Sequence, residues 1–115
     1  MRTIVAGSRT AGLPEVYRAL NDCPFESSIS EVISGTARGA DSAGEHWANA
    51  LDIPVKRFPA DWDKHGRSAG YLRNEEMANH ADALVAVWDG SSRGTKHMID
   101  IARRKGLEVF VYTFR

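Results

Sequence analysis

The sequence predicts an α/β fold: a Rossmann-like three-layer sandwich whose parallel five-stranded sheet has the strand order 3-2-1-4-5. Short apolar runs alternate with helical periodicities along all 115 residues, without repeats or low-complexity tracts. The hydrophobic share of 43% and the charged share of 26% are those of an ordinary globular protein. Strands that alternate with helices form parallel sheets, and right-handed crossovers leave few topologies. In the order predicted here, the chain crosses over between the third and fourth strands.

Five short apolar segments are expected to form the strands. Most of them contain β-branched residues and end at a glycine, a proline or a polar turn residue. The fourth segment is apolar throughout, as in a buried parallel strand. The segments are residues 3–6, 31–34, 53–58, 83–88 and 107–112.

Four segments between the strands carry apolar residues at helical spacing. The first begins near Leu13, Asp41 is placed to cap the second, and the third and fourth cover residues 69–80 and 95–105. Residues 59–68 are expected to form a loop. The side chains expected on the apolar faces of these helices include Tyr17, Trp47, Leu51, Leu72, Met77, Ala81, Met98, Ile101 and Ala102.

Length, charge and cysteine content exclude several classes of protein. The chain fits one domain, and its 15 basic residues equal its 15 acidic ones, which argues against a broad basic face that binds nucleic acid. No apolar run is long enough to cross a bilayer, and no signal peptide is recognisable, so we expect a soluble, cytoplasmic protein. Cys23 is the only cysteine, which excludes an intramolecular disulfide and a CxxC metal pair.

A homo-oligomer is also expected. A domain of this size buries a modest share of its surface, so association with a second copy adds stability. Tyr17, Trp47 and Met98 are apolar residues beyond what one small sheet is expected to cover.

The loops that follow the strands hold the candidate ligand-binding residues. In doubly wound sheets, ligands bind at the carboxyl ends of the strands, where the winding reverses. Three of these loops combine glycine, a hydroxyl residue and arginine, and such loops present backbone N–H groups, hydroxyl donors and a guanidinium to phosphate oxygens. The candidates are Gly7, Ser8 and Arg9 after the first strand; Gly35, Thr36, Arg38, Gly39 and Asp41 after the second; Trp62, Arg73 and Asn74 after the third; and Asp89, Ser92, Arg93, Gly94 and Thr95 after the fourth.

Each of these residues also has a purely structural interpretation. A glycine can simply permit a tight turn, Asp41 can cap a helix, and Asp89 can either bind a ribose hydroxyl or form a turn. Trp62 can stack on a base or close the pocket. The sequence contains neither GxGxxG nor GxxxxGK[ST], and no metal site or cofactor is expected, because the acidic residues near Asp61 are typical of a solvated loop.

Several of these motifs, in this order, identify the chain as resembling the YspA/YpsA-related branch of the SLOG superfamily, which includes the lonely-guy phosphoribohydrolases and DprA. The resemblance implies a Rossmann-like fold and binding of nucleotides or nucleotide-derived ligands. The motifs are Gly7-Ser8-Arg9, Ser34-Gly35-Thr36-Ala37-Arg38-Gly39-Ala40-Asp41, Phe58-Pro59-Ala60-Asp61-Trp62, Ala69-Gly70 with Arg73-Asn74 and Met77-Ala78, and Trp88-Asp89-Gly90-Ser91-Ser92-Arg93-Gly94-Thr95.

The same resemblance bears on whether the chain is an enzyme. Arg73-Asn74 and Gly94-Thr95 are similar to two elements of the phosphoribohydrolases, but His97 stands where that family has a glutamate. N-glycosidic cleavage commonly uses a carboxylate to stabilise an oxocarbenium-like sugar or to activate water. We therefore expect a protein that binds a nucleotide or nucleotide-derived small molecule as a sensor or sequestering module. The alternative is a phosphoribohydrolase-like enzyme, and nucleic-acid binding is disfavoured.

Overall fold

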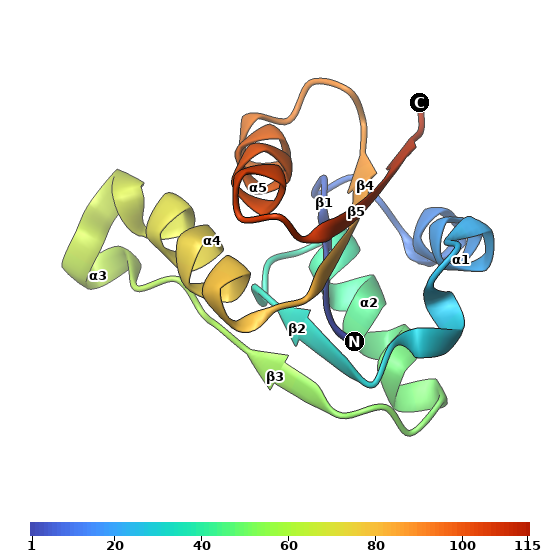
Figure 1. Cartoon of the computed structure of the whole chain (residues 1–115). Coiled ribbons are helices and arrows are strands. Elements are labelled where there is room, and N and C mark those ends of the chain that lie inside the picture. Colours follow the sequence, from blue (N-terminus) through green and yellow to red (C-terminus); the bar gives the residue numbers. More distant parts are fainter.

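The strands of the chain form a single parallel sheet in the order β3-β2-β1-β4-β5, as the sequence predicts (Figure 1). The structure is a computed structural model that describes residues 1–115. The strands are β1 (Arg2–Gly7), β2 (Glu31–Ser34), β3 (Val55–Arg57), β4 (Ala83–Trp88) and β5 (Glu108–Thr113). β1 and β4 lie side by side in the middle of the sheet, with Ile4 opposite Leu84 and Gly7 opposite Val87.

Two layers of helices cover the sheet. One face is covered by α1 (Leu13–Asp22) and α2 (Ala40–Ala50), and the other by α4 (Ala69–His80) and α5 (Arg93–Arg104). Side chains alternate between the faces along each strand, so Val5 and Val85 pack with the first pair of helices while Ile4 and Leu84 pack with the second. This burial on both faces explains why β4 is apolar throughout.

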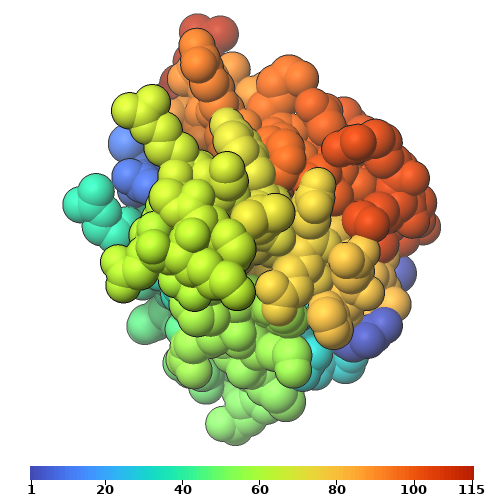
Figure 2. Space-filling model, turned by 90° about the vertical axis from the view of Figure 1, so that its left-hand side faces the viewer, coloured from blue at the N-terminus to red at the C-terminus, as the bar shows by residue number.

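The segment between β3 and α4 is helical, so the expectation of a loop over residues 59–68 was wrong. It contains the short helix α3 (Trp62–His65) and the 3₁₀ turn η2 (Gly66–Ser68); a second 3₁₀ turn, η1 (Glu26–Ser28), precedes β2. The Asp61 carboxylate caps α3 by accepting the Lys64 N–H at 3.1 Å. Figure 2 shows α3 and η2, in yellow-green, standing on the surface beside α4.

Several smaller expectations also need correction. α5 begins at Arg93 rather than Thr95, and β3 is shorter than the predicted 53–58. Leu51 is 55% exposed because it lies at the C-cap, where α2 ends. Leu72 is 43% exposed because the buried stripe of α4 contains Ala69, Asn74, Met77 and Ala78, which leaves Leu72 on the solvent side.

Two of the three apolar residues expected to favour an oligomer are buried within one copy of the chain. Trp47 and Met98 are 6% and 1% exposed within one copy of the chain, so the helices and the sheet already cover them. Tyr17 remains 39% exposed. No helix combines the length and the apolar character that crossing a membrane requires.

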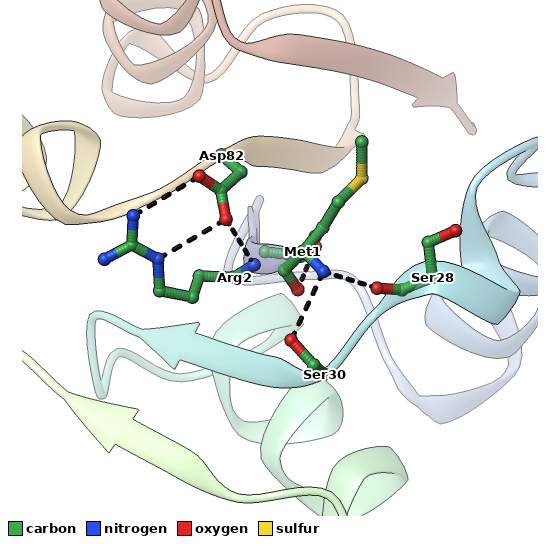
Figure 3. A network of polar contacts seen from close by, with 6 residues as sticks. Met1, Arg2, Ser28, Ser30 and Asp82 are labelled. Carbon is green, nitrogen blue, oxygen red and sulfur yellow. Dashed lines mark hydrogen bonds and ion pairs between the residues drawn. The ribbon is translucent and has the colours of Figure 1, made fainter.

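Polar contacts tie the strands together at their amino-terminal edge (Figure 3). The Asp82 carboxylate accepts the Arg2 backbone N–H at 2.8 Å and pairs with the Arg2 guanidinium at 3.3 Å. The Met1 ammonium donates to the Ser28 carbonyl oxygen and to the Ser30 hydroxyl at 3.2 Å. Because the strands are parallel, the loops that carry the candidate ligand-binding residues all lie at the opposite edge.

Candidate functional site

A cleft of about 840 Å³ opens at the carboxyl edge of the sheet, between the loops after β1, β2 and β4 and the segment from α3 into α4. Its volume falls within the range of small-molecule sites, roughly 300–1,000 Å³. The lining combines backbone of the strand ends, cationic side chains and two aromatic rings. Its residues are Ala6, Gly7, Arg9, Thr10, Thr36, Ala37, Arg38, Asp41, Pro59, Ala60, Trp62, Arg67, Gly70, Tyr71, Arg73, Asn74, Asp89, Ser92, Gly94, Thr95 and Met98.

The loops after β1 and β2 pack backbone against backbone at Gly39. This residue has φ +78°, and a Cβ there would lie 2.5 Å from the Arg9 carbonyl carbon. The Ser8 carbonyl oxygen accepts the Ala40 N–H at 3.2 Å, and the Ser8 hydroxyl accepts the Asp89 N–H at 2.9 Å. Ser8 is 1% exposed, so Ser8 and Gly39 hold the three loops together from behind the cleft.

Asp41 forms part of the cleft wall as a buried carboxyl. Gly39, not Asp41, is the N-cap of α2, which corrects the expected capping role. Asp41 is 4% exposed, and its Oδ2 accepts the Ala37 N–H at 3.2 Å. Burial raises the pKa of this carboxyl from 3.8 to about 6, against the opposing effects of the Ala37 N–H and the Arg73 charge.

Arg73 lies beside Asp41 and reaches the loop after β2. Its Nη1 donates to the Gly35 carbonyl oxygen, and burial lowers the pKa of the guanidinium while the Asp41 charge opposes that shift. A Cβ at Gly35 would lie 2.6 Å from Arg73 Nη1 and 2.7 Å from Asp41 Oδ2. Gly35 therefore provides the space in which the guanidinium and the carboxyl meet.

Asn74 connects α4 to the start of α5. Its Oδ1 accepts the Arg73 Nε–H at 3.1 Å, and its Nδ2 lies 3.4 Å from the Gly94 carbonyl oxygen and 3.2 Å from His97 Nδ1. Asn74 is 6% exposed and all its hydrogen-bonding groups have partners in the protein. The His97 ring packs edge-on against the Tyr71 ring, with 4.4 Å between the ring centroids. His97 is not among the residues that line the cleft.

The loop after β4 is organised by Asp89. Its Oδ1 accepts the backbone N–H groups of Ser91 and Ser92 at 2.9 and 2.8 Å, and these bonds lower the pKa of the carboxyl. The Ser92 and Thr95 hydroxyls bond to each other at 3.1 Å. Gly94 has open space around the position of a Cβ, so nothing within 4 Å requires a glycine there.

Positive charge gathers in the cleft although the whole chain has none in excess. Arg9, Arg38, Arg67 and Arg73 line it, and the three ion pairs of the chain all lie elsewhere. Asp41 and Asp89 are the only carboxylates among the lining residues. The rings of Trp62 and Tyr71, 53% and 45% exposed, form one side of the cleft.

The cleft brings together most of the residues singled out in the sequence. The exceptions are Ser8, Gly35, Gly39 and Arg93, which do not line it. Sequence reasoning missed Arg67 and Tyr71. Gly66-Arg67-Ser68 has the same three residue types as Gly7-Ser8-Arg9, a signal that could have identified Arg67.

The chain is similar to several known proteins. The model of the YspA, cpYpsA-related SLOG family matches residues 1–65. The chain is 35% identical over 116 residues to the Gene 61 protein of Mycobacterium phage D29, an alignment that covers 94% of this chain and 93% of that protein. It is 47% identical over 32 residues to the uncharacterized SPbeta prophage-derived protein YoqJ of Bacillus subtilis, covering 28% of this chain and 19% of YoqJ.

One solved structure has a similar fold. The chain superposes on DNA processing protein A (DprA) from Streptococcus pneumoniae with a TM-score of 0.77 and 16% sequence identity. The match covers 99% of this chain and 50% of the DprA chain, so the chain spans half of that protein.

Proposed function

We propose, since the chain belongs to the YspA, cpYpsA-related SLOG family, that its cleft binds a nucleotide or a nucleotide-derived phosphate ligand and that the protein acts as a sensor or sequestering module. The observation that carries this proposal is the group of four arginines in the cleft, none of which forms an ion pair within the chain. Guanidinium groups that line one cleft without an ion-pair partner favour a ligand with several anionic oxygens.

The other walls of the cleft suit the remaining parts of a nucleotide. Trp62 and Tyr71 offer exposed aromatic faces on which a base can stack. Gly94 and Thr95 lie at the start of α5, where backbone N–H groups and the helix dipole favour an anion. The volume of about 840 Å³ accommodates a mononucleotide and leaves room for a second phosphate or ribose.

A thermal-shift screen tests the proposal. The panel contains nucleoside mono-, di- and triphosphates, ADP-ribose derivatives and short oligonucleotides, and hits are measured by isothermal titration calorimetry. We expect at least one nucleotide or nucleotide derivative to bind. If only oligonucleotides bind, or if no compound binds at millimolar concentration, the proposal is wrong.

The Arg73→Ala variant then tests the site. A charge-assisted hydrogen bond to phosphate contributes about 1.5–3 kcal/mol, so we expect roughly ten- to more than a hundredfold weaker binding. Arg18→Ala removes an exposed arginine of α1 outside the cleft and should leave the affinity unchanged. Equal affinities for the two variants would place the ligand elsewhere.

A phosphoribohydrolase-like activity is the second candidate, and Asp41 is the observation that favours it. This cleft-lining carboxyl has its pKa raised to about 6, so roughly a tenth of it stays protonated at pH 7, far more than for an ordinary aspartate. In such a reaction, the bond from the base nitrogen to C1′ breaks and the carboxyl donates its proton to the leaving base. Water then adds to C1′ of the ribose phosphate and gives up a proton to the carboxylate. Chromatography of each bound nucleoside 5′-monophosphate for free base tests it; a bound compound that stays intact excludes this activity toward that compound.

A further inference from the structure

A continuous chain of hydrogen bonds runs through the wall of the cleft from the loop after β2 to α5. It starts at the Gly35 carbonyl oxygen, passes through Arg73 and the Asn74 amide, and ends at the Gly94 carbonyl oxygen and His97 Nδ1. Arg73 lines the cleft, whereas His97 does not. A change at His97 can therefore reach the guanidinium without His97 touching a ligand.

The neighbours of Asn74 settle the orientation of its amide. Arg73 Nε–H is a donor and needs the amide oxygen, while the Gly94 carbonyl oxygen is an acceptor and needs the amide nitrogen. The amide nitrogen carries two hydrogens, and the second points to His97 Nδ1 at 3.2 Å. His97 Nδ1 must then be the acceptor, so the ring is neutral with its proton on Nε2.

Protonation of His97 breaks this arrangement. A proton on Nδ1 would point at the Asn74 amide hydrogens, so two hydrogen-bond donors would face each other with no acceptor between them. Rotating the amide would restore the contact with His97, but it would remove the acceptor from Arg73 Nε–H and the donor from the Gly94 carbonyl oxygen. No orientation of Asn74 satisfies a protonated His97 and Arg73 together.

The surroundings of the ring contribute to its charge state. Tyr71 and Glu75 of α4 and Asp100 and Arg104 of α5 lie around it. Burial lowers the pKa of His97, Glu75 and Asp100 oppose that shift, and Arg104 adds to it. The neutral ring that the hydrogen bonds require is thus also the form that burial favours.

We propose that His97 is a positioning residue for Arg73: the neutral ring holds Asn74, Asn74 holds the guanidinium at the cleft, and proton uptake by His97 weakens anion binding. The proposal rests on the proposed function, because it concerns how the cleft holds a phosphate group. The direction of the predicted pH effect distinguishes this role from direct contact, since a histidine that attracted the anion directly would strengthen binding when protonated.

Asp41 also takes up a proton on acidification, and its protonation has the opposite effect on anion binding. Its pKa is about 6, and its protonation removes a negative charge from beside Arg73, which strengthens anion binding as the pH falls. A loss of affinity on acidification therefore cannot arise from Asp41. The probe must not titrate either, so ADP-ribose is suitable because both of its phosphates stay ionised between pH 5 and pH 7.5.

A measurement on the free protein tests the positioning directly. We expect the NMR signal of Arg73 Nε–H to shift with the titration of the His97 ring between pH 7.5 and pH 5. In His97→Asn the amide oxygen takes the place of Nδ1 as acceptor, so the signal should no longer follow a titration at this position. An Arg73 signal that ignores the His97 titration in the wild-type protein overturns the proposal.

Binding of ADP-ribose tests the consequence for the cleft. Loss of one hydrogen bond predicts that protonation of His97 weakens binding by the wild-type protein about fivefold relative to His97→Asn at the same pH, and the effect of Asp41 cancels in this ratio. At pH 7.5, His97→Ala should bind about fivefold more weakly than the wild-type protein, whereas His97→Asn should bind as tightly as the wild-type protein. His46→Ala, which removes an exposed histidine of α2, should keep the wild-type pH profile.

The possible failures are distinguishable. An affinity that changes on acidification by the same factor in His97→Asn as in the wild-type protein overturns the positioning role and leaves the proposed function intact. Absence of ADP-ribose binding at every pH, together with a negative nucleotide screen, overturns the proposed function and with it the role of His97 in anion binding.

Discussion

Replacing Asp41 with asparagine should stabilise the protein relative to the wild-type protein by an amount that grows as the pH rises from 4 to 7. The Asp41 carboxyl is 4% exposed, and burial raises its pKa from 3.8 to about 6. A group whose pKa is higher in the folded state binds more protons there, so its favourable contribution is complete below pH 3.8 and is lost as the pH rises through about 6. Asparagine keeps an oxygen that can accept the Ala37 N–H but cannot ionise.

The pKa difference sets the size of the effect. A change from 3.8 to about 6 corresponds to about 3 kcal/mol of unfolding free energy. We expect the free energy of unfolding of Asp41→Asn minus that of the wild-type protein to increase by this amount, to within a factor of two, between pH 3.5 and pH 7.5. Urea denaturation at five pH values measures both proteins, and titrations common to both cancel in the difference.

Asp82→Asn is the matched control, since its effect has the opposite sign. Hydrogen bonds from Arg2 lower the pKa of the Asp82 carboxyl, so its contribution is present above pH 3.8 and is lost as the pH falls. The difference curve for Asp82→Asn should therefore slope downward with rising pH. A flat or downward curve for Asp41→Asn would show that Arg73 and the Ala37 N–H outweigh burial, and that the carboxyl is fully ionised at neutral pH.

Three further predictions concern the cleft and the surface. Gly35→Ala should destabilise the protein, because the added Cβ would come within 2.7 Å of Arg73 and Asp41. Gly94→Ala should stabilise the fold by about 0.4–1 kcal/mol, since the added Cβ meets no atom within 4 Å. Thermal unfolding measures both variants, and similar shifts in the two would refute the assigned packing around Gly35. Trp62→Ala should weaken nucleotide binding measured by calorimetry while changing unfolding little, because the ring is 53% exposed; unchanged affinity would exclude stacking on this ring. A homo-oligomer stays a prediction that rests on the small size of the domain and on the exposed Tyr17, and a monomeric mass by light scattering at micromolar concentration would contradict it.

Much of the fold could be predicted because its pattern is local. Apolar runs and helical spacing located all five strands and four of the helices. The rule of right-handed crossovers then left few topologies, and the Rossmann-like order 3-2-1-4-5 chosen among them is confirmed. The short helix α3 escaped because four residues are too few to show a helical period, although Asp61 is an ordinary N-cap. Leu72 was misplaced because one apolar residue beside a true stripe cannot be told from a member of it.

The site was predictable as a set of loops and unpredictable as a set of contacts. Gly, Ser, Thr and Arg marked the loops after the strands as candidate binding loops. These loops meet at one edge because the carboxyl ends of parallel strands share that edge. The sequence could not show that Ser8 and Gly39 would stand behind the cleft while Arg67 and Tyr71 lined it.

The sequence by itself determined the layers, the strand order and the family motifs, because these follow from the spacing of residues along the chain. Only the tertiary structure decided the chemistry of individual groups. The raised pKa of Asp41 needs burial strong enough to outweigh the Arg73 charge, and the neutral ring of His97 needs the Asn74 amide held from two other sides. These partners come from α2, α4 and α5. Their separations in space are set by how the helices pack on the sheet, which no local pattern records.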